Sequence, residues 1–353
     1  MQFYMAPMEG LTGYVYRNAY HRHFHNIDKY FTPFLTNRNL NHKEINDILP
    51  EHNAGMQVVP QILTNRAEDF LCIAKVLAEY GYHTVNLNLG CPSGTVVTKH
   101  RGAGFLAVPE ELDAFLEEIF AGCPLNISIK TRIGMEHPQE WERLMAIYEK
   151  YPLEELIIHP RVQSDFYKNT PHYEVFGTAM EGSRHSLCYN GDIYSVEDYR
   201  GLVGKFPKLE KVMLGRGILT NPGLVGAIRG TLTLLNPTVD EKITTLQACV
   251  QEMPDRARRI NSEFVPSPKN STQEIKGLDK DTLRAFLDDI LHGYTAVMSG
   301  DRNTLFKMKE LWVYLGHSFT NPEKYMKKIK KAECIAEYET MVNMLFREQD
   351  LIR

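Results

Sequence analysis

The sequence has 353 residues, of which 43% are hydrophobic and 24% charged, and its formal net charge is −4. This composition is that of an ordinary globular protein, so disordered, collagen-like and low-complexity classes are excluded. The small negative charge excludes nucleic-acid binding by bulk charge alone and leaves a local basic face possible. No apolar run reaches the roughly 18 residues of a membrane span, and the N-terminus lacks a signal-peptide pattern. Six cysteines without a C-x-x-C pair indicate free thiols, so we expect a soluble, cytoplasmic protein.

Strand-like and helix-like segments alternate along the first two thirds of the chain. Short β-branched or apolar runs occupy residues 3–6, 29–34, 58–63, 84–89, 126–133, 155–159, 186–189 and 211–214. Helical periodicity follows most of them, at 13–25, 66–80, 110–120, 138–151, 196–205 and 222–229, and is weaker after the second and sixth runs. Eight strand–helix units in about 230 residues predict an α/β fold of the (β/α)₈ TIM-barrel type. A doubly wound open sheet is the alternative.

The last third of the chain has no strand pattern. Apolar stripes at helical spacing run through residues 281–294, 305–315 and 332–348, and a polar segment at 261–279 is predicted to be a loop. We therefore predict a barrel domain at 1–235 and a small all-helical domain at 236–353. The basic residues of the second domain cluster at Arg256, Arg258 and Arg259 and at Lys324, Lys327, Lys328, Lys330 and Lys331. All of these lysines except Lys330 share one helical face, which is either a solvated face or a contact for a polyanion.

The predicted strands end in polar residues, and the active site of a TIM barrel forms at those ends. The ends carry Gln61, Asn88 to Pro92, Lys130 to Arg132, His159 to Arg161, Asn190 to Asp192 and Gly215 to Gly217. Phosphate groups commonly bind between the loops after strands seven and eight. Glycines there allow close approach of the backbone to an anion, and Arg216 adds positive charge. The pair of loops favours a phosphate-bearing ligand.

Cys91 is the candidate for a reactive side chain, because Gly90 and Pro92 place it at a strand end. A thiol with an ordinary pKa near 8.5 is mostly protonated at neutral pH and can donate a proton. A nucleophilic role would need a base, for which His159 is the candidate. The remaining cysteines are interpreted as small buried hydrophobes. His21, His23 and His25 are spaced so that they point to different helix faces, so no metal site is expected. The glycine-rich run after Arg101 is a mobile lid, a nucleic-acid contact or a plain flexible loop.

Together these motifs resemble the tRNA-dihydrouridine synthases. The resemblance rests on Ala6 to Gly10, Asn88 to Pro92, Arg101 to Gly104, Lys130 to Arg132, Ile158-His159, Asn190 to Asp192 and Gly215 to Gly217. It runs in order through the barrel and is strongest around Cys91. It implies an FMN-dependent barrel with a helical RNA-binding domain, which reduces the 5,6 double bond of uridine in tRNA with NADPH or NADH as the electron source. It implies neither a metal nor a membrane partner, and a monomer is expected.

The resemblance also implies a role for each matching position. The flavin would be contacted by Pro7, Met8, Gln61, Lys130 and His159, and its phosphate by Asn190, Gly191, Asp192, Gly215 and Arg216. The substrate would be contacted by Asn88, Lys99, Arg101, Arg132 and Arg161. Hydride from N5 of reduced FMN would reach C6 of the uracil, and Cys91 would then protonate C5. The sequence departs from the family at Pro160, where a glycine usually follows the strand-six histidine.

Three other hypotheses remain open from the sequence. An FMN barrel oxidoreductase acting on a small pyrimidine or enone would need the flavin site and no RNA-binding domain. A dihydrouridine synthase acting on ribosomal RNA would use the same site. A non-catalytic RNA-binding protein would have no need of Cys91, Lys130 and His159 together, and their presence argues against it.

Overall fold

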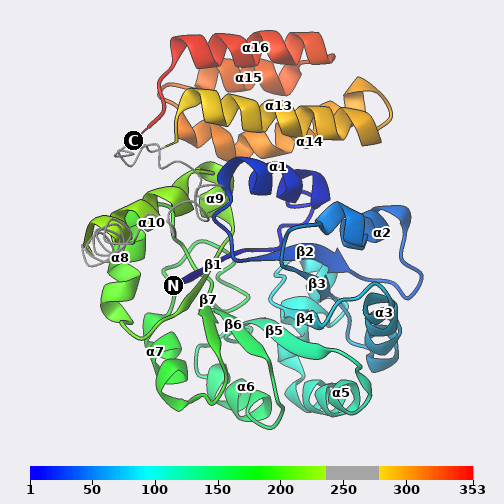
Figure 1. The fold of residues 1–353 in the computed structure, drawn as a ribbon. Helices are drawn as coiled ribbons and strands as arrows, with labels where there is room; N and C mark the ends of the chain where they lie inside the picture. Colours follow the sequence, from blue (N-terminus) through cyan, green and yellow to red (C-terminus); the bar gives the residue numbers. More distant parts are fainter. Residues whose placement is uncertain (236–277, 353) are drawn as a thin grey trace, which may run out of the picture.

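The computed structural model describes residues 1–235 and 278–352. Eight parallel strands pair in chain order and close into a barrel in which β8 returns to β1 (Figure 1). They are β1 (Gln2–Met5), β2 (Lys29–Leu35), β3 (Val58–Ile62), β4 (Thr84–Leu89), β5 (Asn126–Arg132), β6 (Glu155–His159), β7 (Leu187–Tyr189) and β8 (Lys211–Leu214). Each predicted strand is present, with ends shifted by one residue at most. The predicted TIM barrel is therefore confirmed, and the alternative prediction of a doubly wound open sheet is wrong.

Helices surround the barrel between successive strands (Figure 1). They are α1 (Tyr14–Phe24), α2 (His42–Ile48), α3 (Ala67–Glu79), α4 (Gly94–Val97), α5 (Pro109–Gly122), α6 (Glu140–Tyr148), α7 (Tyr173–Gly182), α8 (Val196–Lys205), α9 (Arg216–Thr220) and α10 (Leu224–Leu235), with 3₁₀ turns η1 (Pro50–Asn53) and η2 (Gly102–Ala107). The weaker patterns after the second and sixth strands correspond to α2 and α7. A capping box between Ser195 and Asp198 starts α8, and this fixes the end of the loop after β7.

Alternation along the strands separates two cores. In β1, Phe3 and Met5 join the large core between the strands and the helices, whereas Tyr4 joins the smaller core inside the barrel. Side chains of successive strand residues point to opposite faces, so both faces of this sheet are buried and mostly apolar. This is why the strands are recognisable as nearly continuous hydrophobic runs.

A buried ionic cluster closes the amino-terminal end of the barrel. Glu155, the first residue of β6, accepts hydrogen bonds at 2.8 Å from Lys211 Nζ and from the Tyr4 hydroxyl. Lys29 Nζ lies 3.6 Å from the second carboxylate oxygen. Because these groups fill the end at which the strands begin, the open cavity lies at the carboxyl ends.

A helical region follows the barrel and packs on α1 (Figure 1). It comprises α13 (Lys280–Val297), α14 (Gly300–Leu315), η3 (Gly316–Ser318), α15 (Glu323–Lys331) and α16 (Ile335–Glu348). The ring of Phe286 contacts those of Tyr16 and Phe24 with centroids 5.5 and 5.2 Å apart. Arg22 forms a bidentate ion pair with Asp289, at 2.8 and 2.7 Å. Aromatic packing and this ion pair therefore join the region to the first helix of the barrel.

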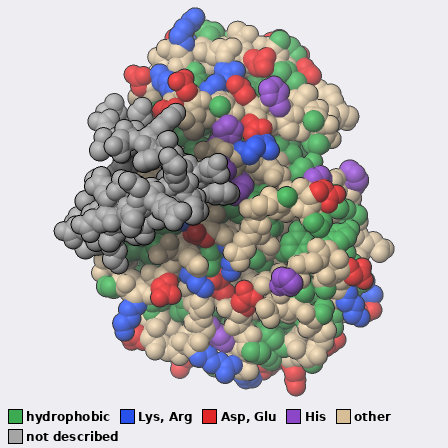
Figure 2. All heavy atoms as spheres, in the orientation of Figure 1, with side chains coloured by type: hydrophobic (Ala, Val, Ile, Leu, Met, Phe, Trp, Pro, Cys, Tyr) green, Lys and Arg blue, Asp and Glu red, His purple; other side chains and the backbone are tan. Residues whose placement is uncertain are grey.

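The lysines of α15 are exposed, whereas Tyr325 and Ile329 on the same helix are buried. On the face shown in Figure 2, basic and acidic side chains are interspersed over the helical region at the top of the view. Cys249, Arg256, Arg258, Arg259, most of the predicted loop at 261–279 and the start of the predicted helical domain lie outside the described residues. None of the helices in the described ranges is long and apolar enough to cross a membrane.

Candidate active site

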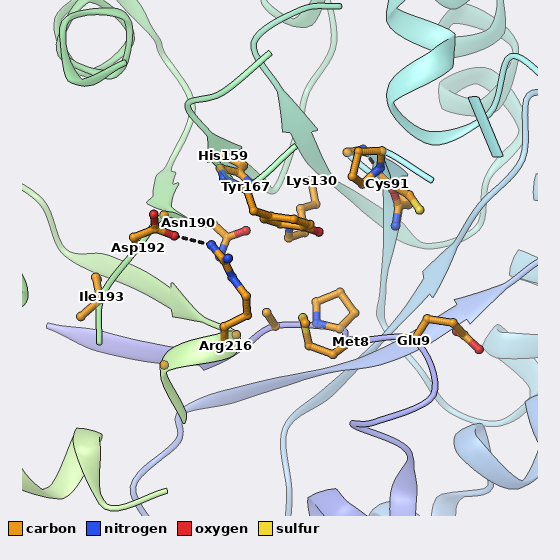
Figure 3. Close-up of a pocket in the computed structure, with 18 of the residues that line it drawn as sticks. Met8, Glu9, Cys91, Lys130, His159, Tyr167, Asn190, Asp192, Ile193 and Arg216 are labelled. Carbon is orange, nitrogen blue, oxygen red and sulfur yellow. Dashed lines mark hydrogen bonds and ion pairs between the residues drawn. The ribbon is translucent and has the colours of Figure 1, made fainter. Parts of the chain in front are cut away.

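A pocket opens at the carboxyl ends of the strands and encloses about 880 Å³ of empty space, including part of its mouth. Among the residues singled out in the sequence, it brings together Pro7, Met8, Asn88, Cys91, Lys130, His159, Asn190, Gly191, Asp192, Gly215 and Arg216 (Figure 3). Side chains from six strand ends therefore meet in one cavity.

A chain of side-chain amides positions the loop that carries Cys91. Asn88 Oδ1 accepts hydrogen bonds from the backbone N–H groups of Gly90 and Cys91, both at 3.0 Å. Asn88 Nδ2 donates to Gln61 Oε1 at 2.7 Å, and Gln61 Nε2 donates to Asn86 Oδ1 at 2.7 Å. Gln61 is fully buried beneath the pocket and is not part of its lining. These hydrogen bonds between side-chain amides therefore hold the Cys91 loop in place from beneath the pocket.

The glycine-rich run after Arg101 packs directly behind Cys91. Gly102 has a φ of +54°, and a Cβ there would lie 2.9 Å from the carbonyl oxygen of Cys91. Ala103 N–H donates to that same oxygen at 3.1 Å. Residues 102–106 are buried in η2. The interpretation of this run as a lid or a flexible loop is therefore wrong, because the glycines are required by close packing.

The thiol of Cys91 is in its protonated form at neutral pH. Burial raises its pKa, and a hydrogen bond from the backbone of Ser93 and the charges of Lys130 and Arg132 offset only part of that increase. A raised pKa makes the thiolate scarce, which disfavours nucleophilic attack and suits proton donation.

Lys130 reaches the pocket from β5 without a carboxylate partner in the described part of the chain. Burial, together with the nearby charge of Arg132, lowers the pKa of Lys130 to about 8. An unpaired cation in a confined site is destabilised until an anion neutralises it. The pocket is therefore suited to a ligand that carries or develops negative charge beside Lys130.

The wall opposite Cys91 is built by ion pairs. Asp192 accepts from both Arg161 and Arg216, and Arg161 also contacts the ring of His159. Arg216 lies against the ring of Tyr167, with its Cζ 4.4 Å from the centroid. Burial, followed by the surrounding arginines and Lys130, lowers the pKa of His159 well below its ordinary value. His159 is therefore uncharged at neutral pH.

Two arginines expected to contact the substrate lie inside the protein wall. Arg132 is 0% exposed and donates to the backbone carbonyls of Gly90, Val162 and Phe166 at 3.0, 2.9 and 2.7 Å. Arg161 is 1% exposed. Neither lines the pocket, and Arg132 ties the Cys91 loop to the loop after β6.

Lys99 and Arg101 lie outside the pocket lining as well. The carbonyl oxygen of Lys99 accepts from Asn65 Nδ2 at 3.1 Å, and Arg101 Nε donates to Asn65 Oδ1 at 3.3 Å. The side chain of Lys99 is exposed. The structure thus places this pair on the rim of the barrel beside the Cys91 loop.

Several residues line the pocket that were not predicted as site residues from the sequence, namely Glu9, Phe34, Tyr167, Ile193 and Tyr194. Tyr167 and Tyr194 are 43% and 38% exposed, which is high for large side chains of this kind. The signal available was an aromatic residue in each of the polar loops that follow β6 and β7. A second, open hollow continues from these tyrosines to Val313, Tyr314 and His317 of the helical region.

A family model described as dihydrouridine synthase matches residues 4–298, which is most of the chain. The chain belongs to the dihydrouridine synthase family. It is 30% identical over 234 residues to the tRNA-dihydrouridine(16) synthase of Pseudomonas putida, covering 64% of this chain and 72% of that protein. It is 29% identical over 230 residues to a probable tRNA-dihydrouridine synthase of Staphylococcus epidermidis, covering 62% and 69%. Over 259 residues it is 24% identical to tRNA-dihydrouridine synthase B of Pasteurella multocida, covering 71% and 77%.

As a dihydrouridine synthase, the protein is an oxidoreductase acting on a carbon–carbon bond. The matched range contains every pocket residue supplied by the barrel, from Ala6 to Gly217. In this family member the residue after His159 is Pro160, and the chain turns tightly there. Arg161 N–H donates to the carbonyl oxygen of His159 at 2.7 Å.

Proposed function

We propose that this dihydrouridine synthase uses FMN to reduce the 5,6 double bond of uridine in tRNA, with Cys91 as the proton donor. The observation that carries the proposal is the pairing of a protonated thiol at Cys91 with an unpaired cation at Lys130 in one cavity. Addition of hydride to uracil followed by a proton needs an acid on one side and charge stabilisation beside the electron donor.

The residues of the pocket fit a flavin mononucleotide. Lys130 would stand beside the electron-rich edge of the ring system, where its positive charge favours the reduced, anionic form. Pro7 and Met8 offer an apolar edge, and Gly215 leaves room beside Met8, since a Cβ there would lie 3.3 Å from Met8 Sδ. Asn190, Gly191, Asp192 and Arg216 would hold the phosphate, as loops after β7 and β8 commonly do.

When bound and reduced, FMN supplies hydride to C6 of the uracil. The protein then has two tasks. It must stabilise the charge that moves through C5 to the C4 carbonyl oxygen, and it must deliver a proton to C5. Cys91 donates that proton through its Sγ–H, and the resulting thiolate is reprotonated by solvent. NADPH or NADH would supply the electrons that keep the bound flavin reduced.

The substrate base must leave its stack to reach Cys91, because the pocket is recessed at the strand ends. The hollow between Tyr194, Tyr314 and His317 lies on the way from the helical region to this pocket. Aromatic side chains of this kind stack on unpaired bases of RNA, and the exposed lysines of α15 would contact phosphates. A tRNA substrate would place the enzyme in the cytoplasm, and we propose that it acts as a monomer.

The test combines a spectrum with a product assay. The purified protein should show the visible absorption of an oxidised flavin, and denaturation should release a compound with the mass of FMN. With NADPH and unmodified tRNA it should form dihydrouridine, detected by mass spectrometry of nucleosides. Cys91→Ala should keep the flavin spectrum and lose at least 100-fold in rate. A colourless protein that takes up no FMN, or activity confined to free uracil or ribosomal RNA, would contradict the proposal.

A further inference from the structure

Arg161 contacts the imidazole of His159 in a way that fixes which ring nitrogen carries the proton. Arg161 Nη1 lies 3.1 Å from His159 Nε2 in a buried contact. A guanidinium has only donors and stays protonated in proteins. Nε2 must therefore accept in this hydrogen bond, and the proton of a neutral ring then resides on Nδ1.

The turn at Pro160 produces this contact. The hydrogen bond from Arg161 N–H to the carbonyl oxygen of His159, at 2.7 Å, closes a three-residue turn centred on the proline. Proline has a fixed φ, which favours a tight turn. The carbonyl oxygen of Pro160 accepts from His172 N–H at 2.7 Å, so the turn is held from outside as well. The side chain of Arg161 is thereby directed back to the ring two residues earlier.

Further contacts prevent the guanidinium from turning away. Arg161 Nε donates to the carbonyl oxygen of Asn169 at 2.6 Å, and Nη2 pairs with the carboxylate of Asp192. With Nη1 directed at His159, all three nitrogens have partners. The arginine is 1% exposed, so no water layer competes for its donors.

The charges around the ring act in the same direction. Lys130 and Arg132 face it from β5, and Arg216 faces it from α9. Burial and these cations, together with Arg161, lower the pKa of His159 well below its ordinary value.

The acidic and phenolic neighbours do not reverse this effect. The carboxylate of Asp192 is already paired with Arg161 and Arg216. The ring of Tyr167 lies 6.0 Å from that of His159, between centroids. The imidazole therefore stays neutral through the physiological range.

We infer that Arg161 is a positioning residue that holds His159 as the neutral Nδ1–H tautomer, so that His159 gives the pocket a hydrogen-bond donor and not a proton. Nδ1 has no hydrogen-bond partner within the described ranges, and His159 lines the cavity. The inference rests on the proposed function only for the identity of the acceptor, a carbonyl oxygen of flavin or uracil. A neutral N–H stabilises charge that builds on such an oxygen without transferring its proton, which leaves protonation to Cys91.

The test is the ¹⁵N spectrum of the histidine rings in the purified, full-length protein as isolated. His159→Asn identifies the His159 signals by their loss. The expected spectrum has a protonated Nδ1 and an unprotonated, accepting Nε2, both unchanged between about pH 5.5 and 8.5. A proton on Nε2, or a ring that titrates within this range, would overturn the inference.

Two variants separate tautomer control from general loosening of the loop. Arg161→Met removes the donor to Nε2, so the single-tautomer spectrum should be lost and turnover should fall by about 10-fold or more. Asn169→Ala removes the contact of Asn169 Nδ2 with Asp165 in the same loop and keeps every donor of Arg161, so the spectrum should not change. An unchanged spectrum in Arg161→Met would refute the role of Arg161. The wild-type spectrum tests the tautomer even if that variant does not fold.

The spectrum also separates this inference from the proposed function. A protein with the expected tautomer that binds no flavin and forms no dihydrouridine would contradict the function alone. An active flavoenzyme with the proton on Nε2 of His159 would contradict the inference alone.

Discussion

The side-chain oxygen of Asn88 accepts the backbone N–H of Cys91 at 3.0 Å, so the residue expected to touch the substrate base also shapes the loop of the proton donor. The same oxygen accepts the N–H of Gly90. Its amide nitrogen is occupied by Gln61. The hydrogen bonds of the Asn88 side chain within the protein therefore predict an effect on the reaction through the position of Cys91.

Replacing Asn88 with alanine should lower dihydrouridine formation by about 100-fold, because a displacement of roughly 1 Å at a reacting group has an effect of that size. Flavin content should not change. Rapid-reaction measurement of reduced enzyme with tRNA would test this. Asn88→Asp keeps the acceptor for both N–H groups and should retain more activity. If Asn88→Asp is as inactive as Asn88→Ala, the hydrogen bond donated by the Asn88 amide contributes more to the rate than the position of the Cys91 loop.

The affinity of the apoprotein for FMN should decline on the alkaline side as Lys130 loses its charge. In the ligand-free pocket the pKa of Lys130 is lowered to about 8, so its positive charge is present below that pH and is lost above it. The electron-rich edge of the flavin would bind the charged lysine better than the neutral one, so the affinity should fall as the pH rises through about 8. Titration of the apoprotein with FMN, followed by flavin fluorescence, would measure this. Lys130→Arg should move the decline to higher pH, and an unmoved decline would assign it to another group.

Lys130 should also destabilise the protein without its cofactor. Its pKa is about 8 in the folded state and 10.5 in the unfolded reference, so the penalty is complete below about pH 8 and fades between those values. Lys130→Met should raise the free energy of unfolding at pH 7 by about 2 to 3 kcal/mol. Urea unfolding of the apoprotein would measure the change.

Lys211→Met provides the contrasting control for that experiment. Lys211 pairs at 2.8 Å with Glu155, which is 1% exposed. Its loss should lower the free energy of unfolding by about 3 kcal/mol, since removing one partner leaves a buried charge less well compensated. A Lys130→Met protein that is less stable than wild type would contradict the assignment of Lys130 as an unpaired cation.

Tyr194 should contribute to RNA binding by stacking. Tyr194→Ala is expected to weaken tRNA affinity by about 10-fold at fixed salt, in the range measured for loss of one base–aromatic stack. Fluorescence titration would give the affinity. Phe306 is a matched control, because it is 61% exposed on α14 and does not line the hollow. Equal losses in Tyr194→Ala and Phe306→Ala would point to a general surface effect.

The sequence predicts the structure best for strands that are buried on both faces. The eight strands are predictable within a residue because parallel strands in a barrel are buried on both faces, as β4 (Thr84–Leu89) and β6 (Glu155–His159) are over nearly their whole length. The polar strand ends likewise predict the lining of the pocket. Cys91, Lys130 and His159 meet there because all barrel strands end on the same face.

The partners of the arginines are not predictable in this way. Arg132 and Arg161 lie at polar strand ends, but their side chains are buried beside the pocket. Both donate hydrogen bonds to backbone carbonyl oxygens, and Arg161 also pairs with Asp192. The direction of a carbonyl depends on loop conformation, which has no periodic signature. Tyr167 was missed for the same reason. Tyr167 lines the pocket from the loop after β6 and directly follows Phe166, whose φ is +50°.

The packing of α13 on α1 fixes the distance between the helical region and the pocket. Phe286 and Asp289 fix the helical region to the helix that directly follows β1, and the end of β1 leads into Pro7 and Met8 at the pocket. The fold therefore fixes the distance from the helical region to Cys91. An RNA bound to the helical region as proposed would therefore present to Cys91 the nucleotide that lies at that distance from its contacts.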